Sequence, residues 1–273
     1  MNKHIDEVEI TIFDTETTGL EPQTGDRIVE IAGIRFRGKE KLATFSTLVN
    51  PQRQISPGAF AVNKISEEML AGAPLISQVM PKFLEFIAGS CLCSYNASFD
   101  LEFLQNELKL LKKDFPQEII VLDVLKMARR LLPQLERYAL WFVAQRLGIK
   151  EQQQHRAFSD VEITWEVFSR LKEILTSKGV TDFKNFSNLF TLNPLLLQNI
   201  NSERIAQIEE AISQALRLKI KYLSSSSAQV TERQVTPKEI KKENNYSYLV
   251  GFCSLRNEER SFRIDGILHL EII

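Results

Sequence analysis

Apolar and polar positions alternate along the first 50 residues in the way that strands require. Valine, isoleucine and phenylalanine recur at every second position or in short runs, and glycine or proline marks the turns between the runs. After about residue 66 the period lengthens to that of a helix. The first part of the chain is therefore expected to form three consecutive strands, at residues 8–13, 27–36 and 43–49.

Strands and helices are expected to alternate over the next hundred residues. Val79, Phe83 and Ile87 share one helical face, and Asp123 stands where an N-cap would begin a helix. Three strands in a row followed by alternation predict a mixed α/β sheet flanked by helices, which closes near residue 176. The expected elements are strands at 91–95 and 119–122 and helices at 98–112, 123–132, 138–147 and 161–175.

A second unit is expected after a weakly patterned stretch. Residues 177–202 keep many apolar side chains and contain an Asn-Pro break, which suits an ordered connector better than a flexible linker. A helix around Ile208 then leads into short alternating runs. We predict a first domain at 1–176, a connector at 177–202 and a β-rich domain at 203–273, with strands at 219–223, 229–236, 246–254 and 261–264.

The amino-acid composition is that of a folded globular protein. Of the 273 residues, 44% are hydrophobic and 25% charged, as in a folded protein with a sizeable core. The formal net charge of -1 leaves a nucleic-acid partner open, because phosphate contacts depend on local basic patches. The three cysteines match neither a disulfide framework nor a zinc site, which fits a reducing cytoplasm. No apolar run reaches the roughly 18 residues of a membrane span, and the acidic N-terminus does not resemble a signal peptide, so we expect a cytoplasmic protein with no membrane partner.

Two carboxylates follow the first predicted strand. Residues two apart on a strand point to the same face, so Asp14 and Glu16 present their side chains together while Thr15 turns away. Taken alone, this pair is also typical of a solvated strand end. The turn that follows begins at Thr17 and contains Gly19, which allows backbone and hydroxyl groups to approach a bound nucleotide closely. The pair is therefore a candidate metal site beside a candidate nucleotide site.

Two more acids and a histidine complete a set of groups that phosphodiester hydrolysis uses. Asp100 opens a predicted helix, where the helix dipole alone would also explain an aspartate. Asp160 follows His155, which is the one histidine away from the termini. On an ideal helix these two side chains would lie about 140° apart, so His155 is expected in a loop or first turn if both are to face one site. From there it can take a proton from water near neutral pH, while four carboxylates suit divalent cations.

These residues stand in three motifs, FDTETTGL, NASFD and HRAFSD, whose order and spacing resemble the DEDD exonucleases of the histidine-bearing subtype. Within that family the chain is similar to the epsilon-type proofreading exonucleases of bacterial DNA polymerase III, from about residue 8 to 175. The resemblance implies an RNase H-like fold and release of 5′-nucleotides from a 3′ end. It also implies that His155 is the general base and that two Mg²⁺ or Mn²⁺ ions are held by Asp14, Glu16, Asp100 and Asp160.

The same resemblance implies contacts with the terminal nucleotides of the substrate. Leu20 and Val62 fall where such enzymes place apolar wedges against the terminal bases, although ordinary packing would explain each as well. Residues 62–65 read Val-Asn-Lys-Ile where the family usually has Val-His-Gly-Ile, and Gly58 replaces a frequent glutamate, so substrate preference stays open. The candidate substrate-binding residues are Thr17, Leu20, Val62, Asn63, Asn96 and Phe99.

The C-terminal stretch, from about residue 203 to 273, resembles a WYL domain, a small Sm-like β-barrel of bacterial regulators and defence proteins. The segments at 231–233, 255–256 and 261–265 follow the order of that family, whereas Gly266 replaces its late arginine. Basic groups beside aromatic strand positions can grip single-stranded nucleic acid, although buried tyrosines and solvated arginines are the plainer interpretation. The candidate binding residues are Arg233, Arg256, Arg260 and Arg263.

Three functions follow from these motifs. The first is a metal-dependent 3′–5′ exonuclease that hydrolyses DNA at single-stranded 3′ ends, with polymerase or repair proteins as partners and a C-terminal module that binds nucleic acid or senses a nucleotide. The second is an RNA exonuclease, because the same five groups hydrolyse either polymer. The third is a non-catalytic regulatory protein, which the retention of all five groups argues against.

Overall fold

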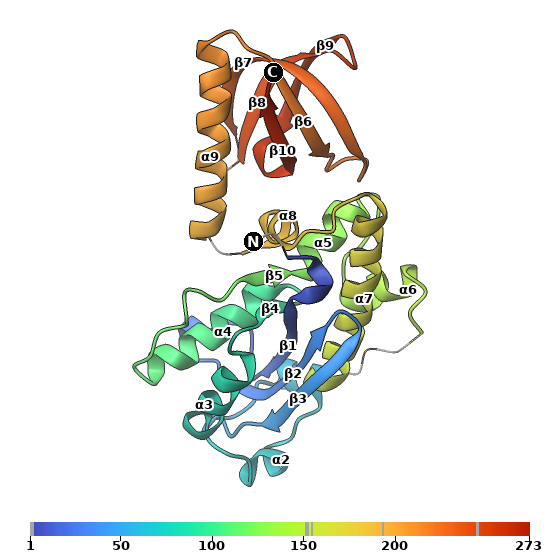
Figure 1. Ribbon diagram of the computed structural model, residues 1–273. Coiled ribbons are helices and arrows are strands. Elements are labelled where there is room, and N and C mark those ends of the chain that lie inside the picture. The colour runs from blue at the N-terminus through green and yellow to red at the C-terminus, as the bar shows by residue number, and fades with distance from the viewer. Residues whose placement is uncertain (1–2, 151–152, 154, 193, 244–245) are drawn as a thin grey trace.

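In the computed structural model the chain forms two units, each built on a five-stranded sheet (Figure 1). The structure describes residues 3–150, 153, 155–192, 194–243 and 246–273. The first sheet has the strand order β3-β2-β1-β4-β5. Its first three strands are antiparallel and the pairs β1–β4 and β4–β5 are parallel, so the predicted mixed sheet is confirmed. The strands are β1 (Glu9–Thr17), β2 (Ile28–Arg37), β3 (Glu40–Leu48), β4 (Cys91–Ser94) and β5 (Val121–Asp123).

Helices cover both faces of this sheet. Alternate residues of β1 point to opposite faces, so Ile10 and Ile12 pack with α5 and α7 while Phe13 packs with α3 and α4. In the described part of the chain every helix is too short or too polar to span a bilayer. The helices of this unit are α1 (Pro57–Asn63), α2 (Glu67–Ala71), α3 (Ile76–Ile87), α4 (Ala97–Leu110), α5 (Val124–Leu131), α6 (Leu140–Arg146), α7 (Ala157–Ser177) and α8 (Phe183–Phe190).

The predicted elements of the first unit are present, and the differences have local causes. β1 continues beyond its predicted end because its ladder with β2 extends to Thr17. The apolar pattern does not predict α1 and α2, which are too short to show a period. Their N-caps explain them, since the hydroxyls of Ser56 and Ser66 accept hydrogen bonds from the backbone N–H groups of Ala59 and Met69.

The predicted connector contains α8, and this helix packs into the first unit. Phe186 and Phe190 are fully buried there, and the ring of Phe186 meets that of Phe168 edge-on at 5.8 Å. The long helix α9 (Pro194–Ser213) follows and packs against the second sheet through Ile208 and Ala211. The apolar side chains of α8 therefore serve the core of the first unit.

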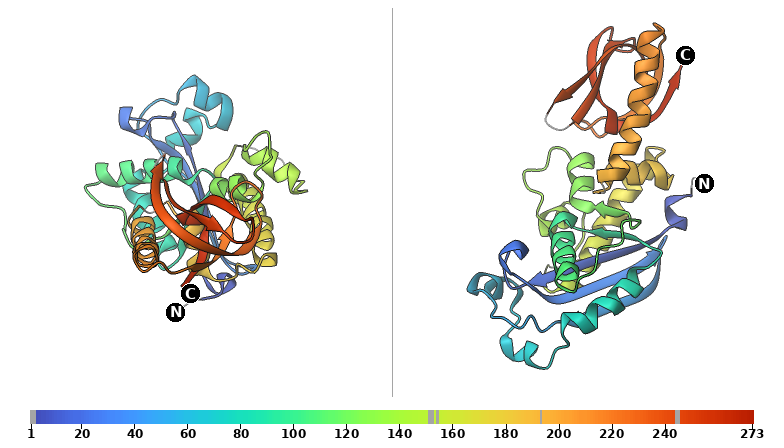
Figure 2. Two further views of the ribbon diagram at one scale, coloured as in Figure 1. Left: turned by 90° about the horizontal axis from the view of Figure 1, so that it is seen from above. Right: turned by 90° about the vertical axis from the view of Figure 1, so that its left-hand side faces the viewer.

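The second sheet is antiparallel throughout and strongly curved (Figure 2). Its order is β10-β6-β7-β8-β9, and among the described residues no ladder joins the edge strands β9 and β10, so the pairing forms an open sheet. β7 pairs with β6 and then with β8, and the register shifts near Pro237. The strands are β6 (Leu218–Leu223), β7 (Val230–Glu243), β8 (Tyr246–Cys253), β9 (Glu258–Arg263) and β10 (Ile267–Ile272), of which β10 was not among the predicted strands.

The two units meet end to end at a buried contact (Figures 1 and 2). The guanidinium of Arg130 on α5 reaches the second unit, where Nη2 donates to the carbonyl of Leu223 at 3.3 Å and Nη1 lies 3.6 Å from Oδ2 of Asp265. Leu223 and Leu268 are themselves buried in the core of the first unit. Apolar packing and a buried charge thus join the units.

Candidate active site

Three carboxylates from two elements converge beside the first sheet. Asp14 and Glu16 project from the end of β1, and Asp160 projects from the first turn of α7. One oxygen of each lies within 4.8 Å of the others, a spacing that suits a shared metal ion. The geometry thus brings the end of β1 and the HRAFSD motif together.

Burial and mutual repulsion raise the pKa values of carboxylates in this cluster. Burial raises the pKa of Asp14 well above its ordinary value, and the charges of Asp100 and Glu16 raise it further. Burial likewise raises the pKa of Glu16 to about 8, with Asp160 and Glu30 adding to the effect. A bound cation would offset this repulsion, because opposite charge at short range favours the ionised carboxylates.

Asp100 is held beside the cluster by its own hydrogen bonds. Its Oδ1 accepts from the backbone N–H of Thr15 at 3.0 Å and from the Thr15 hydroxyl at 2.7 Å, while Oδ2 accepts from the Ser94 hydroxyl at 2.6 Å. Burial raises the pKa of Asp100 to about 6 against the lowering effect of these bonds. Asp100 is not part of the 4.8 Å group, but its charge acts directly on Asp14.

His155 lies in the loop before α7, as its spacing from Asp160 requires. Its φ of 51° is in the left-handed region, and its side chain is exposed. Together with Trp141, Gln145 and Gln153 it lines a cavity of about 640 Å³. Nε2 of Gln153 donates to Oδ2 of Asp160 at 2.5 Å, which joins this loop to the carboxylate cluster. The histidine therefore stands on a loop that reaches the site.

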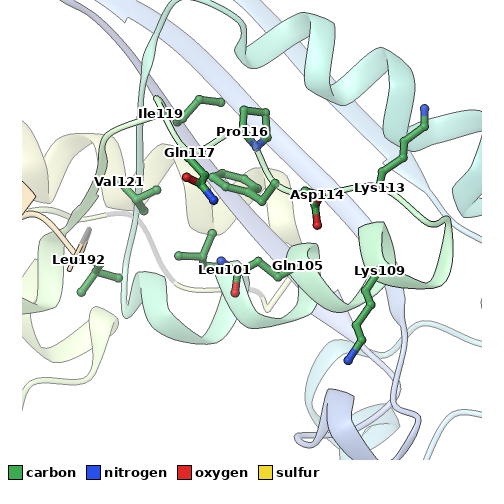
Figure 3. A pocket seen from close by; sticks show the side chains of 11 residues that line it. Leu101, Gln105, Lys109, Lys113, Asp114, Pro116, Gln117, Ile119, Val121 and Leu192 are labelled. Atoms are coloured by element: carbon green, nitrogen blue, oxygen red, sulfur yellow. The ribbon is translucent and has the colours of Figure 1, made fainter. Parts of the chain in front are cut away.

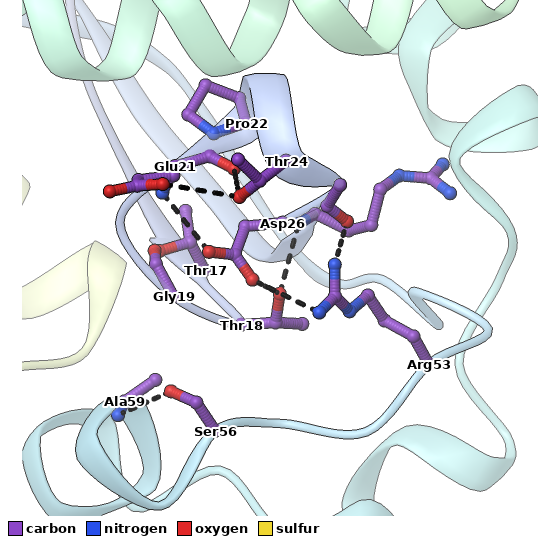
Figure 4. Close-up of polar contacts among 12 residues, drawn as sticks. Thr17, Thr18, Gly19, Glu21, Pro22, Thr24, Asp26, Arg53, Ser56 and Ala59 are labelled. Atoms are coloured by element: carbon purple, nitrogen blue, oxygen red, sulfur yellow. Dashed lines mark hydrogen bonds and ion pairs between the residues drawn. The ribbon is translucent and has the colours of Figure 1, made fainter.

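The carboxylate of Asp26 accepts hydrogen bonds from the turn after β1 (Figure 4). Oδ1 of Asp26 accepts from the Thr18 hydroxyl at 2.9 Å, and Oδ2 accepts from the backbone N–H of Glu21 at 3.1 Å. A Cβ on Gly19 would lie 2.2 Å from Asp26 Oδ2, so a side chain at this position would break the turn. The hydroxyl of Thr17 donates to the carbonyl of Gly19 at 2.5 Å and is thus used inside the turn.

Of the other candidate substrate-binding residues, some have exposed side chains and others are used in hydrogen bonds or core packing. Leu20 and Val62 are exposed apolar side chains, with 79% and 50% of their surface accessible. Asn96 is exposed as well. Asn63 is buried, where it donates to the carbonyl of Thr17 at 3.3 Å and its side chain also lowers the pKa of Glu16. Phe99 packs on Phe103 at 5.0 Å, so part of its ring serves the core.

The four candidate arginines of the second unit do not form one patch. Arg260 and Arg263 are three positions apart on β9 and therefore point to opposite faces. Arg260 pairs with Glu258, while Arg263 pairs with Asp265 and stacks on the ring of Tyr246 at 3.7 Å. Arg233 donates to the hydroxyl of Thr231 at 3.1 Å, and Arg256 is exposed in the turn before β9.

A pocket of about 540 Å³ opens between α4 and the chain segment before β5 (Figure 3). Leu101, Phe115 and Leu192 supply apolar walls, and Lys109 and Lys113 stand at its edge. None of the acids of the carboxylate cluster lines this pocket. It is therefore separate from the candidate active site.

Glu30 and Arg156 adjoin the site and were not among the residues predicted from the sequence motifs. The charge of Glu30 acts on both Asp14 and Glu16, and its carboxylate is paired with Arg156. The signal was present in the sequence, because a glutamate inside the apolar run of β2 must have a buried partner.

Comparisons with known proteins agree with this geometry. Residues 11–168 match the family model described as Exonuclease, and residues 203–272 match that of the WYL domain. A DNA polymerase III epsilon subunit from Treponema pallidum is 40% identical over 166 residues, which cover 60% of this chain and 76% of that protein. A PolC-type DNA polymerase III from Caldanaerobacter subterraneus is 37% identical over 183 residues, or 67% of this chain, but this stretch is only 13% of that polymerase.

Solved structures give the same match for the first unit. Exonuclease X in complex with 5′ overhanging duplex DNA is similar with a TM-score of 0.51 and 29% sequence identity. The match covers 63% of this chain and 94% of that one. The RNase H-like arrangement of the first sheet and its helices is thus shared with a known nuclease.

Proposed function

This chain belongs to the exonuclease family through residues 11–168, and from that premise we propose that it removes nucleotides from the 3′ ends of nucleic acid by metal-dependent hydrolysis. The observation that carries the proposal is the convergence of Asp14, Glu16 and Asp160 within 4.8 Å. The residues fit divalent cations, since three converging carboxylates, with Asp160 buried and Asp14 and Glu16 half-buried, supply the oxygen ligands that hard cations prefer. Magnesium or manganese in a two-ion arrangement is the proposed cofactor.

Each residue of the site has a proposed role. Bound cations would activate a water and stabilise the leaving 3′-oxygen. Asp14, Glu16 and Asp160 would hold them, with Asp100 as a fourth ligand fixed by Thr15 and Ser94. His155, on its exposed loop, would accept the proton of the attacking water as general base.

We propose DNA with a single-stranded 3′ end as the substrate. The similarity to epsilon-type polymerase subunits and to Exonuclease X supports this choice. Leu20 and Val62 are available to contact the terminal bases, because both are exposed apolar side chains. Thr17, Asn63, Asn96 and Phe99 would contribute by shaping the surrounding surface.

The second unit is proposed to bind nucleic acid or a nucleotide through its arginines. We place the boundary between the units at the passage from α8 to α9, because α8 packs into the first core. We propose an Sm-like barrel for this unit, which the register shift of β7 near Pro237 supports, because such a shift bends the strand. Similarity to bacterial polymerase subunits supports a cytoplasmic location and polymerase or repair proteins as partners.

Oligonucleotides with free and blocked 3′ ends test the proposed activity. DNA labelled at its 5′ end should shorten stepwise with Mg²⁺ or Mn²⁺, and a blocked 3′ end should prevent this. Internal cuts in the blocked strand would refute exonucleolytic action. RNA of the same sequence, run in parallel, decides the polymer, since degradation of RNA alone or at an equal rate would refute the DNA assignment.

A further inference from the structure

Glu30 is a fifth carboxylate beside the candidate site. It lies on β2 directly opposite Glu16 in the antiparallel ladder, so the two side chains point to the same face of the sheet. Only 4% of its surface is exposed. A buried carboxylate at this place must be satisfied by specific donors, or else it would itself compete for a cation.

Glu30 accepts hydrogen bonds from two consecutive residues at the start of α7. Arg156 grips the carboxylate with both prongs of its guanidinium, Nε to Oε2 at 3.0 Å and Nη2 to Oε1 at 2.7 Å. The backbone N–H of Ala157 donates to Oε2 at 3.0 Å. Both oxygens are therefore engaged, and such a bidentate pair fixes direction as well as distance.

These two donors stand between the proposed general base and a proposed metal ligand. Arg156 follows His155 directly and is the N-cap of α7, and Asp160 lies in the first turn of the same helix. His155 has a left-handed backbone that needs support from its neighbours. One carboxylate on β2 thus anchors the segment that carries both groups.

We propose that Glu30 and Arg156 are positioning residues, whose pairing places His155 and Asp160 next to the carboxylates of β1. The guanidinium of Arg156 also engages the Glu30 carboxylate, so that Glu30 does not bind the cation. This inference rests on the proposed function of the site. The charge of Glu30 contributes to the raised pKa of Glu16, and the guanidinium of Arg156 compensates that charge. A lysine at 156 would keep the charge but lose the two-pronged grip.

The chain offers a matched control at Arg27, the residue directly before β2. Arg27 grips Glu107 with Nε and Nη2 at 2.8 Å each, and the backbone N–H of Ile28 donates to Glu107 at 3.1 Å. This pair fastens α4, which carries Asp100. Since Asp100 is held separately by Thr15 and Ser94, loss of the Arg27 pair should cost stability without disturbing the site.

The test compares Arg156→Gln, Arg156→Lys and Glu30→Gln with Arg27→Gln in the full-length protein. Misplacement of a catalytic group by about 1 Å costs on the order of 100-fold, so Arg156→Gln should lower kcat by about that factor while KM changes little. Arg156→Lys should fall between this variant and the wild type. The double variant of Glu30 and Arg156 should be no worse than the poorer single variant, because the two act as one unit. Arg27→Gln should lower Tm to a similar extent and retain kcat.

A second measurement does not depend on activity. Amide hydrogen exchange over residues 155–160 should become faster in Arg156→Gln and stay unchanged in Arg27→Gln. An unchanged kcat in Arg156→Gln, an equal loss of kcat in Arg27→Gln, or unchanged exchange over 155–160 would each overturn the inference. An inactive wild-type protein would refute the proposed function alone, and the exchange measurement would then still decide whether Glu30 and Arg156 hold this segment.

Discussion

The hydroxyl of Thr15 donates to Oδ1 of Asp100 at 2.7 Å, so the residue that separates the two carboxylates of β1 holds a third carboxylate from α4. Strand alternation turns Thr15 away from the face of Asp14 and Glu16, toward the helices that pack on the other side. Three neighbouring residues of one strand thereby organise acids on both sides of the sheet. This contact also links the ionisation of Asp100 to one hydroxyl.

Thr15→Val tests this link. The substitution keeps a β-branched strand residue but removes a hydrogen bond that lowers the pKa of Asp100, now raised to about 6 by burial. The pKa should rise further, so the acidic limb of the kcat profile should move to higher pH. Thr15→Ser, which retains the hydroxyl, should leave the limb in place. An identical profile in Thr15→Val would contradict the assignment of Asp100 as a group that must be ionised.

The metal-free protein should gain stability as the pH falls. Burial raises the pKa of Glu16 to about 8 and that of Asp100 to about 6 in the folded protein. The folded state therefore keeps these protons at pH values where the unfolded chain has lost them, and this stabilisation disappears as the pH rises through both values. In EDTA, Tm should increase when the pH is lowered from about 8.5 to about 6.

Added Mn²⁺ should flatten this dependence, since a bound cation favours the ionised carboxylates. Differential scanning calorimetry at several pH values, with EDTA and with Mn²⁺, measures both curves. A metal-free Tm that rises with pH over the same interval would contradict the proposed repulsion among these carboxylates.

Leu20→Ala and Val62→Ala should weaken substrate binding without loss of stability. Burial of a Leu or Val side chain against a terminal base contributes about 1.5–3 kcal/mol, so KM for DNA should rise by about tenfold or more. Leu110→Ala is a suitable control, because Leu110 is also exposed, at 57%, but lies at the far end of α4. If all three substitutions changed KM equally, Leu20 and Val62 would not be contacts of the substrate.

Gly266→Ala should loosen the joint between the units. A Cβ at this position would lie 2.6 Å from Nη2 of Arg130 and 3.1 Å from the carbonyl of Leu223, so Arg130 would have to move. Such overpacking costs about 1–3 kcal/mol. Calorimetry should show an earlier transition of the second unit, whereas Gly72→Ala, which has open space around it, should not. Unchanged unfolding of Gly266→Ala would show that the Arg130 contact does not join the units.

Local patterns in the sequence were sufficient for the main helices and for the strands other than β10. The position of His155 outside a helix was also expected, on the condition that His155 and Asp160 face one site. Such predictions succeed where the controlling interactions lie within a few residues.

Contacts between distant residues were beyond reach of the same patterns. Thr15 meets Asp100 across 85 positions, and Glu30 meets Arg156 across 126. The apolar pattern of the predicted connector does not indicate which core its side chains enter. In the structure, α8 packs into the core of the first unit. The sequence pattern also left Arg260 outside the predicted strand at 261–264, whereas β9 begins at Glu258, so that Arg260 and Arg263 point to opposite faces.

The most direct test of the account is nucleotide release from the 3′ end of single-stranded DNA by the wild type and by Asp14→Ala with Mn²⁺ present. The wild type should release 5′-nucleotides one at a time. Asp14→Ala should fold with an unchanged Tm or a higher one, since it removes a repelled buried carboxylate. Its rate should fall by more than the roughly 100-fold that loss of an outer-shell partner of a metal costs. Undiminished release by Asp14→Ala would contradict the proposed metal site and the function built on it.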